Sequence, residues 1–258
     1  MSDANGEERV VGADRVLAVL VELAAHPQGI ALDDLAGRLH SSKSTVHRAL
    51  GSLRRAGLAT QVARGRYQLG DEFLRLAFRH HAARPEGARI EPVLRDLAER
   101  YGETAHYAVL DGSDVVYRAK VDPPAGAVRL TSTVGGRNPA HRTAVGKMLL
   151  SDELDSEDAL REWLGGRPLE ARTERSITDA GDLWDELVRT RSRGYAVDDQ
   201  ENEVGVNCVA VAVRPSPGAR MLGAISVSAL AFRLPLDALV DAVPAIQARV
   251  DRAVHPPH

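Results

Sequence analysis

The run TAVGK, residues 143–147, has residue types and a spacing that could hold a phosphate group. A nucleotide-binding P-loop, however, also needs a glycine five residues before the Gly-Lys pair and a serine or threonine after the lysine. Those two positions hold His141 and Met148, so the sequence argues against a nucleotide site. What remains is the start of a predicted helix, where small side chains leave backbone N–H groups open to another anion, such as a carboxylate. A helix start that only packs against a neighbouring segment is the alternative interpretation.

A second candidate site is a basic segment, because residues 35–70 carry seven lysine or arginine side chains and no acidic one. Such an excess of one sign is typical of a surface that faces an anionic partner. The spacing of apolar residues predicts helices over 10–29 and over 31–40. A third helix follows at once in the run SSKSTVHRALGSLRRAGLA, where Ser41 or Ser42 can act as the cap.

The third helix has one apolar face, since its apolar residues from Val46 to Leu53 repeat at helical spacing, which leaves the polar and basic residues facing outward. The next run, ATQVARGRYQLG, alternates around Gly65 and predicts a β-hairpin with a basic tip. Together these features predict a winged helix-turn-helix over residues 10–70, with the basic helix in the major groove of DNA. The candidate DNA-binding residues are Ser42, Lys43, Ser44, Thr45, His47, Arg48, Arg54, Arg64 and Arg66.

These candidates differ in what they would contact. The residues at the helix start suit phosphate oxygens, while His47 and Arg48, one turn further on, come within reach of base edges. Arg64 and Arg66, at the hairpin tip, suit the DNA backbone or a minor groove. For each single residue, and above all for Arg54, a solvated surface charge is the competing interpretation.

The remainder of the chain predicts a second domain behind a linker. Residues 1–9 are polar and are expected to be disordered, and 71–84 are expected to form a linker helix that stops at Pro85. Within the second domain, 85–254, Pro92 is expected to start a helix, TAHYAVLD and DVVYRAKVD to form a hairpin, and VRLTST to continue the sheet. Mixed strands and helices without a regular βαβ repeat predict an α+β fold.

Composition narrows the class of protein further. Cys208 is the only cysteine, so no disulfide can form within the chain, and a reducing compartment is expected. The first residues lack the basic and apolar segments of a secretory signal, and no apolar run approaches the roughly 18 residues of a membrane span. We therefore expect a cytoplasmic protein with no membrane partner, and no motif calls for a cofactor.

Two groups of motifs occur in this chain. The run DRVLAVLVELAAHPQGIALDDLAGRLHSSKSTVHRALGSLRRAGLATQVARGRYQLG looks like the winged helix-turn-helix of the IclR family of bacterial transcriptional regulators, with KSTVHR at the centre of that family's recognition helix. GGRNPAHRTAVGKMLL, RSRGYAVDDQENEVGVNCVAVAV and LGAISVSA resemble its effector-binding domain and fall in the family's order. The resemblance implies a GAF-like effector domain over 85–254 and assembly into dimers or dimers of dimers. It also implies binding to double-stranded operator DNA that a small organic acid effector alters.

The resemblance further implies where that acid would lie in the second domain. It places the carboxylate of the acid on the backbone amides of Ala144 and Val145. Asp198, in GYAVDDQE, matches the family's pocket acid, and Cys208, in GVNCVA, matches its pocket cysteine. The helix start that cannot hold a nucleotide is thereby expected to hold a carboxylate.

Other pocket positions combine the resemblance with strand alternation. Ser226 and Ser228, two residues apart on one predicted strand, point to one face and match polar pocket positions. Asn138 stands where the family commonly has an aliphatic residue and Arg142 where it has a small one, which predicts a more polar pocket unless these side chains face solvent. The candidate effector-binding residues are Leu130, Asn138, His141, Thr143, Ala144, Val145, Gly146, Asp198, Cys208, Ser226 and Ser228.

The competing hypothesis is a cysteine-dependent enzyme, or a metabolite sensor whose helix-turn-helix is only structural. Cys208 as nucleophile, His141 as base and Asp198 or Asp199 as the orienting group would form such an enzyme site. A lone cysteine in an apolar strand is more often a small buried hydrophobic residue. The histidines lack the spacing of a closed metal site, so no metal ligand is predicted.

Overall fold

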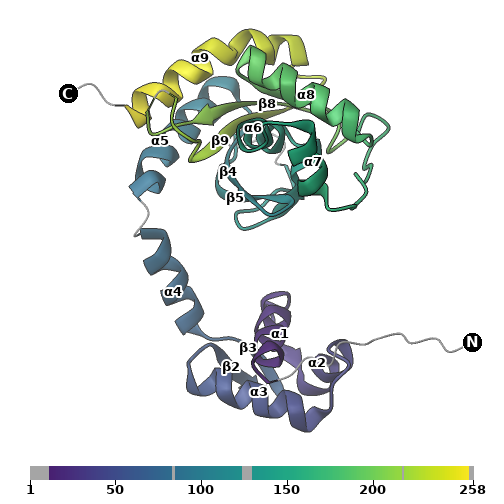
Figure 1. Cartoon of the computed structure of the whole chain (residues 1–258). Coiled ribbons are helices and arrows are strands. Elements are labelled where there is room, and N and C mark those ends of the chain that lie inside the picture. Colours follow the sequence, from purple (N-terminus) through teal and green to yellow (C-terminus); the bar gives the residue numbers. More distant parts are fainter. Residues whose placement is uncertain (1–11, 83–84, 124–129, 217, 256–258) are drawn as a thin grey trace, which may run out of the picture. The chain divides into compact units, whose positions relative to one another are not determined.

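The computed structural model describes residues 12–82, 85–123, 130–216 and 218–255, and it divides into two compact units, Met1–Arg84 and Pro85–His258 (Figure 1). The predicted disorder of residues 1–9 lies outside the described residues, as do 83–84 of the predicted linker helix. The predicted α+β fold class is confirmed, because helices combine with two separate antiparallel sheets. None of the described helices is long and apolar enough to cross a membrane.

The first unit combines helices with a three-stranded antiparallel sheet of order β1-β3-β2. The hairpin of the last two strands was predicted, but the short first strand was not, since two residues carry no periodic signal. The elements of this unit are α1 (Ala13–Ala24), β1 (Ile30–Ala31), α2 (Leu32–Arg38), α3 (Lys43–Arg55), β2 (Ala59–Ala63), β3 (Arg66–Leu69) and α4 (Asp71–Ala82).

Helix α3 forms where its capping residue and its apolar face agree. Ser42, rather than Ser41, is the N-cap residue, and its side-chain oxygen accepts a hydrogen bond from the backbone N–H of Thr45 at 3.3 Å. The apolar face packs into the core of this unit together with residues of α1 and α2. Its buried side chains are those of Val46, Ala49, Leu50 and Leu53.

The second unit is built on one six-stranded antiparallel sheet of order β6-β5-β4-β9-β8-β7. Its strands are β4 (Thr104–Asp111), β5 (Asp114–Val121), β6 (Arg137–Pro139), β7 (Ala196–Asp199), β8 (Val206–Val213) and β9 (Gly223–Leu230). Its helices are α5 (Pro85–Tyr101), the 3₁₀ turn η1 (Ala140–Arg142), α6 (Ala144–Glu153), α7 (Glu157–Leu164), α8 (Ala180–Arg193) and α9 (Leu236–Val254).

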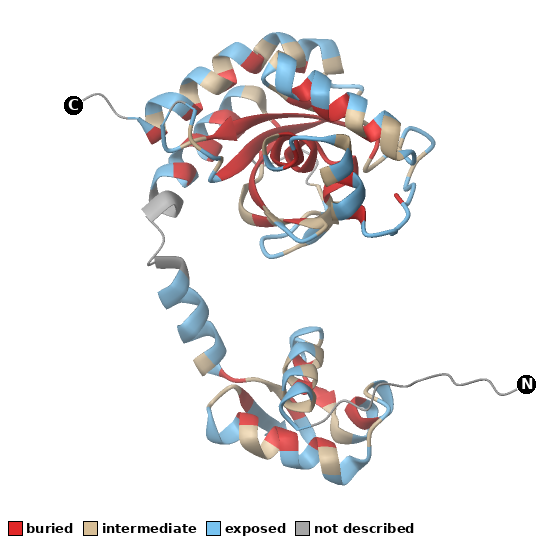
Figure 2. Ribbon diagram, viewed as in Figure 1, coloured by how far each residue is buried: buried red, intermediate tan, exposed pale blue. Residues whose placement is uncertain are grey.

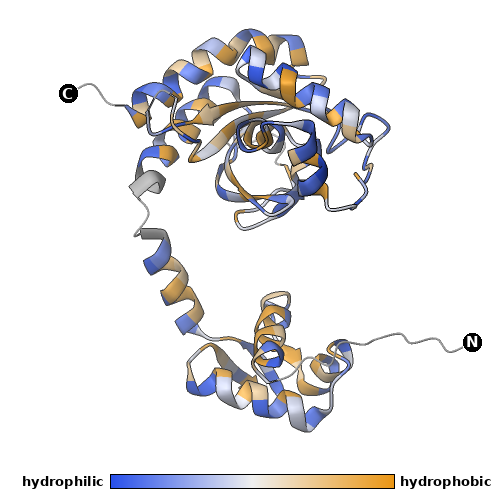
Figure 3. Cartoon of the chain, in the orientation of Figure 1, coloured by the Kyte–Doolittle hydropathy of each residue, from blue (hydrophilic) through white to orange (hydrophobic). Residues whose placement is uncertain are grey.

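Two apolar cores lie on opposite faces of this sheet. Successive side chains of a strand point to opposite faces, so Val209 and Val211 of β8 pack in the core that contains α5 and α9. Cys208 and Ala210 of the same strand pack in the core that contains α6, α7 and α8. The central strands are therefore buried on both faces (Figure 2), and most of their residues are apolar (Figure 3), which explains why β8 is apolar at every position except Asn207.

One predicted helix start and one predicted strand in the second unit were wrong. Helix α5 starts at Pro85, so Pro92 lies inside the helix instead of starting it. Ile90 and Val93, on either side of this proline, are both buried in one core, and this burial holds the helix together across the missing N–H. The described part of VRLTST, residues 130–133, is a loop and not a strand.

Side-chain hydrogen bonds explain that loop. The ammonium group of Lys120 donates to the backbone oxygens of Leu130 and Ser132, at 2.9 and 2.7 Å, so these carbonyls are satisfied without a strand partner.

Strand β7 is present in the structure but was not predicted, because its four residues end in two aspartates, which are rare in strands. It is held by pairing with β8, in a register that sets Asp198 opposite Cys208.

Gly146 lets the start of α6 approach the preceding turn closely. A Cβ atom built on Gly146 would lie 2.1 Å from the backbone oxygen of Ala140, far closer than a real contact. The obstructing atoms belong to backbone that is buried, so they cannot move aside without shifting the helix. Gly146 is therefore required for packing.

We predict that Gly146→Ala destabilises the second unit by about 1–3 kcal/mol, because the added methyl group overpacks a rigid contact. Urea unfolding followed by tryptophan fluorescence measures this, since both tryptophans, Trp163 and Trp184, belong to that unit. Gly181→Ala is the control, because its added methyl meets only the side chain of Asp179, at 3.1 Å. An unchanged midpoint for Gly146→Ala would contradict this account of the helix start.

Candidate ligand pocket and nucleic-acid interface

A cavity of about 190 Å³ lies in the second unit at the start of α6. Strands β6 and β7 form the two opposite edges of the sheet, yet residues of both line this one cavity, so the sheet is strongly curled around it. Nine of the eleven candidate effector-binding residues line it: Leu130, Asn138, Thr143, Ala144, Val145, Asp198, Cys208, Ser226 and Ser228.

The start of α6 presents two free backbone donors to the cavity. Thr143 is the N-cap residue, and its hydroxyl oxygen accepts a hydrogen bond from the N–H of Gly146 at 3.1 Å. The N–H groups of Ala144 and Val145 have no acceptor among the described residues. The amide of Gly146 is thus occupied, and the two amides before it are the ones available to an anion.

Strand register brings the polar side chains of the cavity into two neighbouring rows. Asp198 of β7 lies opposite Cys208 of β8, which in turn lies opposite Ser228 of β9. In the next row on the same face, Ser226 of β9 lies opposite His106 of β4. Four strands, β4, β7, β8 and β9, therefore place polar groups in the cavity that the start of α6 also lines.

Asp198 is nearly fully buried, and its carboxylate is held by its own loop. One of its oxygens accepts hydrogen bonds from the N–H groups of Glu201, at 2.7 Å, and Asn202, at 3.3 Å. Burial, reinforced by the nearby carboxylate of Glu201, raises the pKa of Asp198 to about 7. This residue therefore changes charge near neutral pH, inside the cavity.

Lys147, the lysine of the TAVGK run, does not face the cavity. It is fully buried and forms ion pairs with Glu201, at 2.5 Å, and with Glu186, at 3.9 Å. Because Glu201 belongs to the loop that follows Asp198, this lysine ties α6 to the loop that holds the cavity carboxylate. Its role is to join two elements rather than to bind a phosphate.

Two candidate residues lie outside the cavity. His141 is buried, and its Nε2 atom lies 3.2 Å from the backbone oxygen of Glu170. Gly146 faces the backbone of Ala140, as described above. Arg142 is also outside the cavity, but it is buried rather than solvent-facing, and it donates a hydrogen bond to the side-chain oxygen of Asn202 at 3.1 Å. Arg142 therefore adds no polar side chain to the cavity wall, whereas Asn138 lines the cavity.

The sequence-based prediction missed an important part of the cavity wall, on β4 and β5. His106 contacts the Ser132 hydroxyl through Nε2, at 2.7 Å, and its ring lies 4.9 Å from that of Tyr117. Burial, together with the charge of Lys120, lowers the pKa of His106 to about 3, so the ring is neutral. A histidine inside the apolar run TAHYAVLD was the one available signal for this site.

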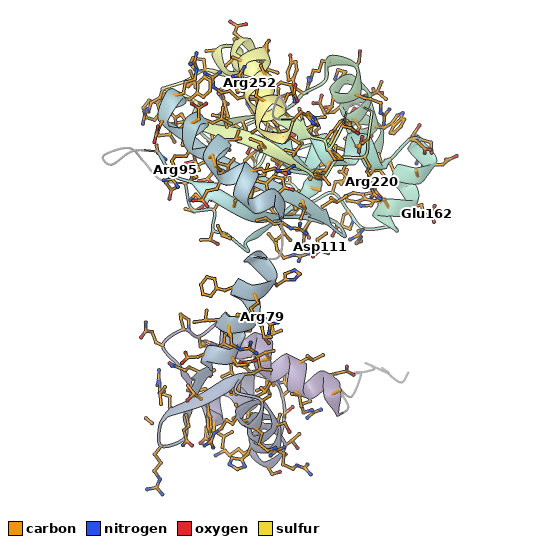
Figure 4. All side chains as sticks on the ribbon, turned by 90° about the vertical axis from the view of Figure 1, so that its left-hand side faces the viewer. Arg79, Arg95, Asp111, Glu162, Arg220 and Arg252 are labelled. Carbon is orange, nitrogen blue, oxygen red and sulfur yellow. The ribbon has the colours of Figure 1, made fainter. Side chains whose placement is uncertain are left out.

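The exposed side of the cavity carries two arginines. Arg137 pairs with Asp114 and with Asp111, which lies at the tip of the β4–β5 hairpin and is labelled in Figure 4. The side chain of Arg172 has no hydrogen-bond or ion-pair partner among the described residues, and it lines the cavity. Of these two arginines, Arg172 therefore offers an unpaired positive charge to an anion in the cavity.

The geometry does not favour a cysteine nucleophile. Burial, followed by the proximity of Asp198, raises the pKa of the Cys208 thiol well above its usual range, so the reactive thiolate is disfavoured. The proposed base, His141, does not line the cavity that Cys208 lines. Within the described ranges, no group of three or more His, Cys, Asp or Glu side chains is placed to hold a metal ion.

The first unit presents the candidate DNA-binding side chains on its surface. Ser44, His47 and Arg48 of α3 are exposed on the face opposite to its buried residues. Arg64 and Arg66 are exposed at the β2–β3 turn, where Gly65 has a φ of +70°. Ser42 and Thr45 instead contact each other at 2.8 Å, as part of the helix cap.

The basic side chains of this surface differ in how far they are already engaged. Lys43 pairs with Asp33 at 2.8 Å, although both groups are exposed. Arg66 donates a hydrogen bond to the backbone oxygen of Gln28 at 3.3 Å. Three guanidinium groups have no partner among the described residues and are available to phosphates or bases: those of Arg48, Arg54 and Arg64.

Comparison with known proteins finds a matching family domain in each of the two units. Residues 12–63 match the IclR helix-turn-helix domain, and residues 87–253 match the bacterial transcriptional regulator IclR C-terminal domain. The HTH-type transcriptional regulator BhcR of Paracoccus denitrificans is 35% identical over 240 residues, which cover 89% of this chain and 82% of that protein.

Solved structures resemble most of the chain as well. The IclR transcriptional regulator of Alicyclobacillus acidocaldarius has a TM-score of 0.78 at 27% identity, covering 93% of this chain and 96% of its own. An IclR homologue of Microbacterium hydrocarbonoxydans, complexed with 4-hydroxybenzoate, has a TM-score of 0.73 at 23% identity, covering 91% and 98%. The second likeness shows the fold alone. The matches to both domains and the sequence identity to BhcR establish that the chain belongs to the IclR family of DNA-binding bacterial transcriptional regulators.

Proposed function

We propose that this regulator senses a small organic acid, which binds in the cavity of the second unit and alters the affinity of the first unit for operator DNA. The observation that carries this proposal is the pair of unsatisfied amides, on Ala144 and Val145, at the wall of a polar cavity. A carboxylate accepts hydrogen bonds from both amides and is favoured by the positive end of the helix dipole. The acid 4-hydroxybenzoate in the Microbacterium homologue supports this class of ligand.

The DNA-binding half of the proposal uses α3 as the recognition helix and the β2–β3 hairpin as the wing. The unpaired guanidinium group of Arg48 lies one turn into α3, where it suits a base edge. The unpaired guanidinium group of Arg64 lies at the hairpin tip, where it suits a phosphate. The cap residues from Ser42 to Thr45 fix the start of the helix against the DNA backbone.

A homo-oligomer completes the functional unit. From residue 71 to residue 80, no side chain of α4 is buried, although a helix of 12 residues is only marginally stable in water. Phe78 of α4 is 69% exposed and Val21 of α1 is 70% exposed, so both helices present apolar side chains without a partner. A second copy of this chain fits these faces best, because helix-turn-helix proteins read paired half-sites as dimers.

Ligand and DNA are then linked through the populations of two states. The acid changes operator affinity only if it binds one arrangement of the paired DNA-binding units better than the other. Residues 71–84 connect each DNA-binding unit to its ligand-binding unit, so they are the segment through which this preference acts.

For the DNA contact, we predict that Arg48→Ala and Arg64→Ala act differently. Arg48→Ala should cost about 1–3 kcal/mol at its preferred base and reduce discrimination among sites. Arg64→Ala should weaken binding equally at all sites and lower the salt slope by about one. Gel shifts on the upstream region of the gene, at several salt concentrations, measure both, with Arg220→Ala in the second unit as control. Wild-type binding by both variants would mean that α3 is not the recognition helix.

For the acid, we predict an affinity that rises as the pH falls through about 7. Below that pH Asp198 carries its proton, whereas above it the ionised Asp198 and the carboxylate of the ligand repel each other in one cavity. The affinity should then fall by up to about tenfold per pH unit. A thermal-shift screen of small organic and aromatic acids finds a ligand, and calorimetry from about pH 6 to about pH 8.5 measures its affinity.

The control for this pH dependence is Asp198→Asn, which keeps the shape of the side chain but cannot ionise. Its affinity should stay nearly constant over the same range. Glu201 and Lys147 remain in place, so any slope that they cause is common to both proteins. Equal slopes in the two proteins would show that Asp198 does not face the acid.

For the oligomer, we predict that Val21→Glu combined with Phe78→Glu converts the protein to a lower oligomeric state, because it places charges in an apolar contact. Sedimentation equilibrium measures this change. Phe232→Glu, which alters a phenylalanine that is 81% exposed on the second unit, should leave the assembly unchanged. A double variant that sediments like the wild type would exclude α1 and α4 as the contact.

A further inference from the structure

The cavity has a second polar region, on the strands farthest from Asp198 in the order of the sheet. Tyr117 lies on β5 and Asn138 on β6, and both line the cavity. Asn138 pairs with Val115, and Tyr117 is two residues further along β5, so both side chains are on one face. The side-chain nitrogen of Asn138 donates a hydrogen bond to the Tyr117 hydroxyl oxygen at 3.2 Å.

This region is neutral at ordinary pH. Burial raises the pKa of Tyr117 to about 12, and the neighbouring His106 is neutral as well. Lys120, whose charge acts on His106, already donates to two backbone oxygens and pairs with Asp122 at 2.9 Å, and Arg137, next to Asn138, pairs with Asp111 and Asp114. A second carboxylate would therefore lose its hydration here without gaining Lys120 or Arg137 as an unpaired cation in return.

The pair still has hydrogen-bonding capacity to offer. The Tyr117 hydroxyl accepts from Asn138, but its own O–H has no acceptor among the described residues. The side-chain oxygen of Asn138 likewise has no donor there. The pair keeps one free donor and one free acceptor whichever way the amide is turned. By contrast, both ring nitrogens of His106 already contact serine hydroxyls.

One free donor beside one free acceptor is the complement of a hydroxyl group, which both accepts and donates. We propose that the effector is a hydroxy acid, with its carboxylate on the α6 amides and its hydroxyl bound by Tyr117 and Asn138. This inference rests on the proposed function, since it takes the carboxylate position from it. An acid without the hydroxyl would leave two polar groups of the wall unsatisfied, which is how polar sites reject apolar analogues.

The test compares acids that differ only in a hydroxyl group. Calorimetry on the full chain uses benzoate against 3- and 4-hydroxybenzoate, and butanoate against 3- and 4-hydroxybutanoate. At least one hydroxy acid should bind about tenfold more tightly, or better, than its parent acid. Tyr117→Phe and Asn138→Leu should each reduce this preference to less than about threefold, mainly by weakening the hydroxy acid.

A matched control comes from the neighbouring strand. Tyr107 of β4 is buried in the opposite core, and its hydroxyl donates to the backbone oxygen of Leu222 at 3.0 Å. Tyr107→Phe removes a tyrosine hydroxyl outside the cavity, so the preference for the hydroxy acid should persist in this variant.

The outcomes separate this inference from the proposed function. Acids that bind without any preference for a hydroxyl group overturn the hydroxy-acid assignment but leave the acid site in place. A preference that survives both Tyr117→Phe and Asn138→Leu, or tighter binding of a dicarboxylate such as succinate, overturns it too. If no acid in the panel binds the wild-type chain, the acid site and the hydroxy-acid assignment both fail.

Discussion

The buried ion pair between Lys147 and Glu201 is the interaction on which the cavity of the second unit depends. Lys147 is fully buried on α6, and Glu201 follows the β7 strand that carries Asp198. Removing one partner of such a pair leaves an uncompensated buried charge and costs about 3–5 kcal/mol. The pair thereby fixes the start of α6, with its two free amides, against the loop that holds Asp198. Thr173 and Ser176 donate to the backbone oxygen of Glu201 as well, so the segment that carries Arg172 is tied to the same point.

The curl of the sheet brings residues of its two edge strands to the same cavity. Because β6 and β7 are the edges of one sheet, only curling brings Asn138 and Asp198 to one cavity. The result is a cavity with two chemically different regions: a helix start with two free amides beside an ionisable aspartate, and a neutral pair of hydrogen-bonding groups on β5 and β6. The run TAVGK contributes the free amides of Ala144 and Val145 to the first region. Its lysine, Lys147, does not line the cavity and pairs with Glu201 instead.

The sequence predicted what local patterns and family motifs encode. The cap and buried face of α3, the hairpin at Gly65 and the α6 start follow from spacing alone. Ser226 and Ser228 share a face because strand side chains alternate. His106 and Tyr117 were missed because their place in the cavity depends on the curl of the sheet, which no local pattern records. Gly146 and His141 were assigned to the cavity but lie outside it. A residue beside a site in sequence need not face that site. Pro92, which was expected to start a helix, lies inside α5 because buried neighbours on both sides hold the helix together.

The central claim is that one acid, bound in the cavity, changes how tightly the chain holds its operator. The direct measurement is the operator affinity of the full chain, with and without a saturating concentration of an acid that calorimetry shows to bind. The account predicts a change of about fivefold or more, the lower end of common allosteric coupling, and a matching change in acid affinity when operator is present. An operator affinity that is the same with and without the bound acid would contradict it.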